Sequence, residues 1–162
     1  MAQKLFTVEE VLTILAATPK RFAELTAGLS ETQLHKGPTP GEWSANDVLA
    51  HVRACADVRG GAALKIVAED RPTFRAMDPR DYMLRTDYPR LDFRPSLRSF
   101  TRQRARLLTT LKALPSEGWS RAATVTGAGA PLQRTVLFYA SWVARHERPH
   151  VRQMARIVEA LG

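Results

Sequence analysis

The sequence predicts an all-α protein, a single four-helix bundle spanning residues 1–162. Three observations lead to this fold class. Apolar residues recur at helical spacing in four long segments, and two of those segments open with a helix-capping pattern. A long, proline-rich stretch separates the second segment from the third, so helices two and three can run in the same direction. The expected topology is therefore up-down-down-up, with a long crossover between helices 2 and 3.

The first two helices are expected at residues 7–29 and 45–68. Thr7 begins the first with a capping-box pattern, and Ser44 begins the second in the same way. Pro19 lies within the first helix, where a missing backbone donor predicts a kink or a break.

Residues 69–95 contain four prolines and are predicted to form an ordered crossover, because aromatic and apolar residues give the segment material to pack. Helices are expected again at 96–114 and 133–161. The Gly-rich run at 124–131 favours a turn or a small hairpin and lacks the spacing of a phosphate-binding loop.

Composition indicates a globular protein, with 44% hydrophobic and 25% charged residues. The single cysteine excludes an internal disulfide, and no apolar run approaches the roughly 20 residues that cross a bilayer, so a cytoplasmic protein with no membrane partner is expected. The net charge of +8 raises the question of nucleic acid. The cations are scattered, and the stripe of Arg98, Arg102 and Arg106 is typical of a solvated helix face, so nucleic-acid binding is disfavoured.

Three of the four histidines are predicted to form one metal site. His146 and His150 are four residues apart and project from one face of the last helix, within about 6 Å of each other. His51 shares a face of the second helix with Cys55. Two imidazoles from one helix and one from its neighbour can hold a divalent ion while leaving coordination positions open. His35 lies in a turn-rich connection, where solvent exposure is expected.

The runs PTPGEWSANDVLAHV and HERPHVRQM resemble the DinB/YfiT family of metal-dependent proteins. In that family a Trp-Ser element, matched here by Trp43 and Ser44, opens the second helix. His51 matches the first ligand and His146 and His150 the H-x-x-x-H pair. The runs FRPSLRSFTRQRARLL and TVLFYASWVARH are also similar, so the resemblance spans nearly the whole chain.

This sequence departs from the family pattern at two places. Family members often carry an acidic residue shortly after the helix-two histidine, and here the first is Asp57. Pro149 lies between the two histidines of the pair and is expected to bend the last helix there.

Residues 146–150 also spell H-E-x-x-H, the zinc-protease signature in which Glu147 would be the general base. Pro149 fits that helix poorly, no third ligand follows at the usual spacing, and no sheet is predicted that could align a peptide. Glu147 is therefore interpreted as a carboxylate that is solvated or that supports a metal ligand from behind.

The resemblance implies a thiol S-transferase or isomerase that uses a low-molecular-weight thiol and acts on a small-molecule substrate, with a homodimer as the implied assembly. Three neutral imidazoles would equally suit activation of water. Zinc or nickel is expected, with iron or manganese as alternatives. A non-catalytic metal-binding or stress-related bundle stays open as a second class, and an anion or nucleic-acid binder as a third.

Four further residues could line the pocket or support the ligands. Tyr139 and Trp142 precede His146 by two turns and one turn, and ordinary core packing is the alternative for both. Cys55 lies one turn after His51 and is either a fourth ligand or a buried apolar residue. Gln153 follows His150 on the same face. Trp43 is interpreted as a staple and core residue.

Overall fold

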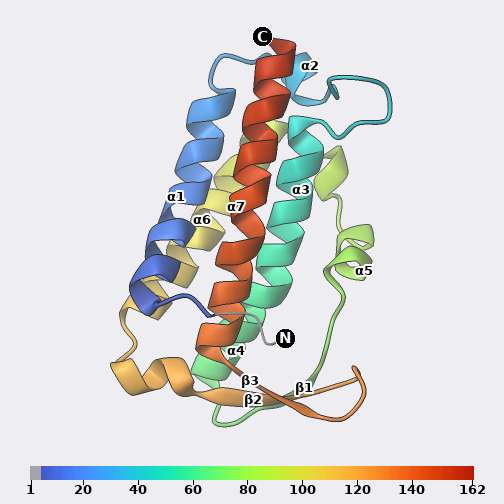
Figure 1. The fold of residues 1–162 in the computed structure, drawn as a ribbon. Coiled ribbons are helices and arrows are strands. Elements are labelled where there is room, and N and C mark those ends of the chain that lie inside the picture. Colours follow the sequence, from blue (N-terminus) through green and yellow to red (C-terminus); the bar gives the residue numbers. More distant parts are fainter. Residues whose placement is uncertain (1–4) are drawn as a thin grey trace.

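Four long helices stand side by side with a small sheet across one end (Figure 1). The computed structural model describes residues 5–162. The colours of Figure 1 show the first and last helices running away from the sheet and the two between them running toward it. Their bounds are Val8–Thr26 (α1), Ala45–Cys55 (α3), continued through a π-helical turn Ala56–Gly60 (η1) into Gly61–Ala68 (α4), Phe93–Lys112 (α6), and Val136–Leu161 (α7).

Local capping explains where the helices start. Thr7 Oγ1 accepts from the backbone N–H of Glu10 at 3.1 Å, and Ser44 forms a full capping box with Asp47. A capped start satisfies backbone donors that would otherwise lack partners. A kink or a break was expected at Pro19; the break does not occur, because α1 continues through Pro19 to Thr26.

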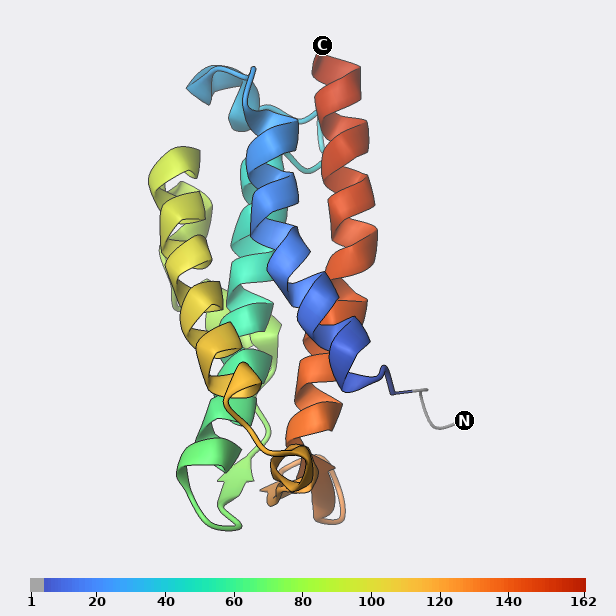
Figure 2. The same ribbon diagram turned by 90° about the vertical axis from the view of Figure 1, so that its left-hand side faces the viewer.

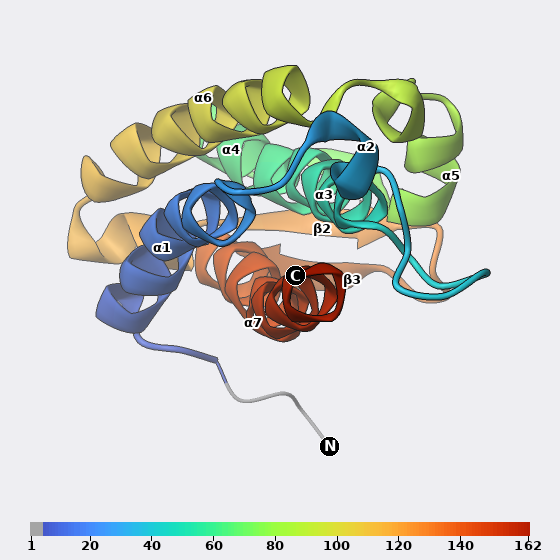
Figure 3. The same ribbon diagram turned by 90° about the horizontal axis from the view of Figure 1, so that it is seen from above.

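Looking down the bundle shows how the helices neighbour one another (Figure 3). Helices α1 and α3 each pack against both α6 and α7. The pairs α1/α3 and α6/α7 are therefore the diagonals of the bundle, and the side view in Figure 2 separates α6 from α7. Among the described residues, no helix is long and apolar enough to cross a bilayer.

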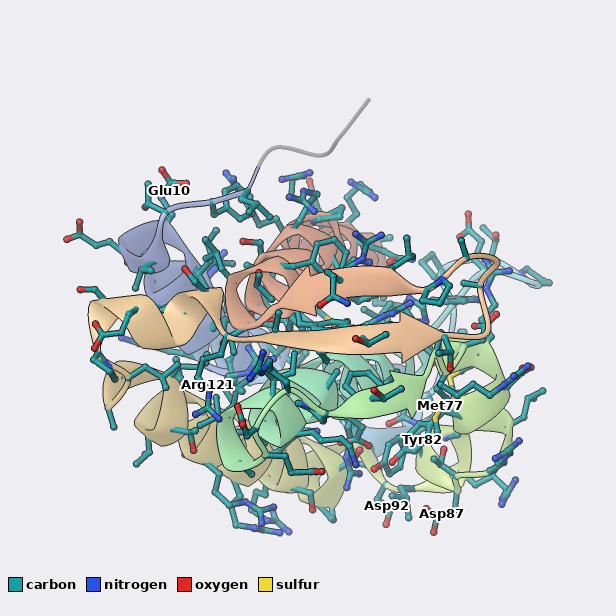
Figure 4. The ribbon with its side chains drawn as sticks, turned by 90° about the horizontal axis from the view of Figure 1, so that it is seen from below. Glu10, Met77, Tyr82, Asp87, Asp92 and Arg121 are labelled. Atoms are coloured by element: carbon teal, nitrogen blue, oxygen red, sulfur yellow. The ribbon has the colours of Figure 1, made fainter. Side chains whose placement is uncertain are left out.

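The fold is mostly helical but not strictly all-α, because three short strands form a sheet in the order β1-β2-β3. Figure 4, viewed from this end, shows the strands lying across the bundle. Strand β2 pairs in parallel with β1 and antiparallel with β3, and Gly127 and Gly129 take positive φ in the β2–β3 turn. The strands span Thr73–Arg75 (β1), Ala122–Thr126 (β2) and Leu132–Thr135 (β3).

The small hairpin expected near 124–131 is therefore present, whereas the expectation of no sheet is wrong. Strand β2 buries Ala123 and Val125 on alternate positions against the bundle. The last helix consequently begins at Val136, since the residues before it belong to β3. Arg121, labelled in Figure 4, donates to the carbonyls of Val67 and Glu69 and ties the end of α4 to the start of β2.

The crossover is ordered, and one of the groups that fasten it to the bundle is the carboxylate of Asp57. Asp57 Oδ2 accepts from Tyr82 Oη at 2.9 Å and from Tyr88 Oη at 2.5 Å, while Gln103 Nε2 donates to its other oxygen. The acidic residue nearest after His51 is thus used for anchoring the crossover. Besides β1, this segment contains Pro79–Leu84 (α5) and Tyr88–Arg90 (η2); the remaining short elements are Glu31–Leu34 (α2) and Ser116–Ser120 (η3).

A buried ion pair crosses the core along the α6/α7 diagonal. The side chains of Arg104 and Glu147 are 2% and 1% exposed. Arg104 Nη1 donates to Glu147 Oε1 and to the carbonyl of Leu15, each at 2.8 Å, and Nη2 donates to Glu147 Oε2. Three of the four long helices are therefore joined by one guanidinium group.

Candidate metal centre

The structure brings His51, His146 and His150 together where α3 lies against α7. The Nε2 atoms of His51 and His146 are 2.9 Å apart. The ring centroid of His150 lies 4.8 Å from that of His51 and 4.6 Å from that of His146. The two α7 histidines share a face because one helical turn separates them, and the helix remains continuous through Pro149.

The spacing of the His51 and His146 nitrogens fits a shared divalent ion, whereas His150 is placed beside them by its ring and is not in the group of ligand atoms that lie within 4.8 Å of one another. Two nitrogens that each lie about 2.0–2.1 Å from one zinc ion are about 2.9–3.4 Å apart, depending on the angle at the metal. Burial, together with a smaller contribution from neighbouring histidines, lowers the pKa of His51 to about 4 and that of His146 to about 3. Both rings are therefore neutral at pH 7, which is the form that offers a lone pair to a metal.

Gln153 fixes the tautomer of His150. Its Oε1 lies 2.8 Å from His150 Nδ1. Because an amide oxygen only accepts, Nδ1 is the donor in this hydrogen bond, and Nε2 is the ring nitrogen that remains for a metal. Outer-shell partners of this kind orient metal-binding imidazoles.

Two tryptophans pack against the histidines. Trp142 stacks on His146 with ring centroids 4.9 Å apart and planes 12° apart. Trp43 meets His51 edge-on at 5.3 Å and is 42% exposed, so it is a wall of the site and not the core residue expected from its staple position. The sequence did contain a sign of this role, because Trp43 precedes His51 by about two helical turns.

Cys55 lies close enough to His51 and His146 to be a further metal ligand. Its Sγ is 3.9 Å from His51 Nε2, and the candidate ligand atoms of His51, Cys55 and His146 all lie within 4.8 Å of one another. Burial raises the pKa of the Cys55 thiol to about 12, so the thiol is protonated when no ion is present. Both interpretations of Cys55, fourth ligand or buried apolar residue, remain compatible with this geometry.

Two other candidates lie away from the histidines. Tyr139 is buried and packs against Phe74 and Phe138, as a core aromatic residue does. Glu147 is fully buried and paired with Arg104, so the interpretation as a solvated carboxylate is wrong. Because Glu147 is buried and paired with Arg104, it is not placed to act as the general base of an H-E-x-x-H site.

His35 is exposed and pairs with Glu31 at 3.2 Å. Asp92 lies nearby and completes a small polar group on the surface, distant in sequence from the three clustered histidines.

The histidines line a cavity of ≈ 710 Å³. Its opposite wall is the crossover, which contributes Met77 and Arg80, while Arg59 extends the wall begun by Cys55. Met77 lies beside the end of the sheet nearest α5 in Figure 4. Sequence reasoning missed these three residues. Arg59 could have been found, since it lies one turn after Cys55 on the same face; the crossover residues carried no periodic signal.

Comparisons with known proteins agree with this architecture. The sequence model of the DinB superfamily matches residues 14–154. Among solved structures, YfiT from Bacillus subtilis superimposes with a TM-score of 0.70 at 16% sequence identity, covering 96% of this chain and 91% of that one. YfiT is described as a probable metal-dependent hydrolase with an unusual four-helix bundle topology. No curated protein matches the sequence.

Proposed function

The chain belongs to the DinB superfamily, and on that premise we propose that it is a metal-dependent enzyme whose ion is held by His51, His146 and His150. The observation that carries the proposal is the convergence of three imidazoles on one wall of an open cavity. Such an ion, when bound, supplies Lewis-acid chemistry that lowers the pKa of a coordinated water or thiol. Zinc or nickel suits the all-nitrogen ligand set.

The protein's own residues hold and shield this centre. Gln153 keeps His150 in the tautomer that leaves Nε2 free, and Trp142 fixes the plane of His146 by stacking on it. The Arg104–Glu147 pair, on the adjacent face of α7, fixes the rotation of this helix about its axis. The crossover forms the opposite wall of the open cavity.

We propose a low-molecular-weight thiol as the nucleophile, which would make the protein an S-transferase acting on a small electrophile. A cavity of ≈ 710 Å³ lies within the range of small-molecule sites and can take both partners. Water is the alternative nucleophile, and the description of YfiT as a probable metal-dependent hydrolase supports that second candidate.

Metal content measured by mass spectrometry on protein purified without chelators tests the proposal. The native protein should hold about one ion per chain, and His51→Ala and His146→Ala should lose it. His35→Ala is the matched control and should retain it. A native protein that binds no ion when offered zinc or nickel would overturn the assignment.

The metal-loaded protein is then assayed in parallel with a thiol plus an electrophile and with ester and amide substrates alone. Consumption of the electrophile only when thiol is present identifies a transferase. Turnover without thiol identifies a hydrolase. Stoichiometric metal with neither activity would favour a non-catalytic bundle.

A further inference from the structure

Two arginines flank the candidate metal centre from different parts of the chain. Arg59 belongs to the π-helical turn η1, and Arg80 lies on α5 in the crossover. Both line the cavity that contains the three histidines. The guanidinium carbon of Arg59 lies 4.9 Å from the ring centroid of Trp142, whose other neighbour is His146. Arg59 is therefore held at a fixed place beside the centre.

Neither arginine is neutralised by an acidic partner. No ion pair of the described residues includes Arg59 or Arg80, and the buried Nε of Arg59 has no hydrogen-bond partner. One carboxylate, Asp78, lines the same cavity, and its Oδ1 accepts from the backbone N–H of Arg80 at 2.8 Å, where it caps α5. A buried guanidinium nitrogen without a partner is costly, and it indicates a place where a ligand supplies the acceptor.

The lining of the larger cavity carries a net positive charge. Arg59 and Arg80 contribute two cationic side chains, whereas Asp78 contributes one carboxylate. An anion that enters the cavity is therefore attracted to this lining.

A second, smaller cavity adjoins this one. It measures ≈ 280 Å³ and shares Arg59, Ala76 and Met77 with the larger cavity. Most of its remaining lining is apolar or aromatic, including Val58 and Phe74. A cavity of about 150 Å³ already suffices to hold a benzene ring. An apolar group can therefore lie there while a polar group stays beside the arginines.

We propose that the substrate is a small organic carboxylate with an apolar group, whose anionic end is bound by Arg59 and Arg80 and whose apolar end lies in the smaller cavity. The inference rests on the proposed function, since it assigns a substrate class to the same site. Arg59 stands at the boundary between the two cavities, so one residue would select for both features.

Isothermal titration calorimetry with phenylacetate, phenylacetamide and acetate tests the proposal on the zinc-loaded protein. Phenylacetate should bind about tenfold more tightly than the neutral amide, because a charge-assisted hydrogen bond is roughly twice as strong as a neutral one. It should also bind about tenfold more tightly than acetate, which lacks the apolar group. Arg59→Gln and Arg80→Gln should each remove most of the preference for the acid over the amide.

Arg98→Gln is the matched control, because Arg98 is an exposed residue of α6 outside both cavities and the charge change is the same. Equal affinity for acid and amide, or equal effects of all three substitutions, would overturn the inference while leaving the metal assignment intact. Should the protein bind no zinc, the proposed function fails, and the same titrations on the metal-free protein still decide whether the arginines bind carboxylates.

Discussion

Replacing Glu147 by glutamine should destabilise the fold strongly, although it changes few atoms. Arg104 is 2% exposed, so the substitution leaves a cation buried with only neutral acceptors. Breaking a buried pair in this way costs about 3–5 kcal/mol. At about 2.1 cal/mol/K per residue, a 162-residue domain has an unfolding entropy of about 0.34 kcal/mol/K, so the melting temperature should fall by about 9–15 °C.

Thermal and urea unfolding of the chelator-treated protein, followed by circular dichroism, measures this loss without a contribution from bound metal. Glu159→Gln, an exposed acid on the same helix, is the control and should change stability by less than about 0.5 kcal/mol. The double variant Arg104→Met with Glu147→Leu should recover at least half of the loss, since apolar residues can replace a buried pair. This reasoning would be refuted if Glu147→Gln lost less than about 1 kcal/mol. It would also be refuted if the double variant lost as much stability as the sum of the losses of Arg104→Met and Glu147→Leu.

Three further outcomes are expected at the candidate metal centre. Gln153→Leu should weaken zinc affinity about 10–100-fold in a chelator competition, whereas Gln153→Glu, which keeps an acceptor for His150, should not. Cys55→Ala should keep zinc affinity within about tenfold, because burial favours the protonated thiol; a thiolate-to-cobalt absorption band in the cobalt-loaded native protein that disappears in this variant would contradict it. The pKa values of His51 and His146 lie at about 4 and about 3 in the folded metal-free protein, below 6.5 in the unfolded chain, so the folded state binds fewer protons. Their contribution to stability is full above pH 6.5 and is lost as the pH falls toward 4, and urea midpoints that stay constant from pH 7 to about 4.5 would argue against it.

Local signals account for the parts of the fold that the sequence predicted well. Thr7 and Ser44 begin their helices as expected, because a cap is formed by residues three positions apart. The histidine pair on α7 was likewise predictable from spacing of one helical turn. His51 was added from its place on the neighbouring helix and from the family motif, since nothing local relates residue 51 to residue 146.

The rest depended on pairings between distant segments. Strand β1 is three residues long and exists because β2, about fifty positions later, offers it an edge to pair with. The partner of Glu147 lies 43 positions away on a diagonal helix, and a glutamate in an H-E-x-x-H run gives no sign of it. Similarly, no sequence pattern distinguishes Arg80 from the other arginines among the nineteen in the chain. Only the fold of the crossover places it in the same cavity as His51.

The division of the cavity between helix and crossover bears on how such a protein can change during evolution. The three histidines, Gln153 and the Arg104–Glu147 pair lie on long helices, whereas Met77 and Arg80 come from the crossover, which Asp57 helps to fasten to the bundle. Insertions and substitutions in that segment can reshape one wall of the cavity without moving any of the three histidines. A lineage built on this scaffold can therefore change what the cavity accepts while inheriting the histidine cluster unchanged.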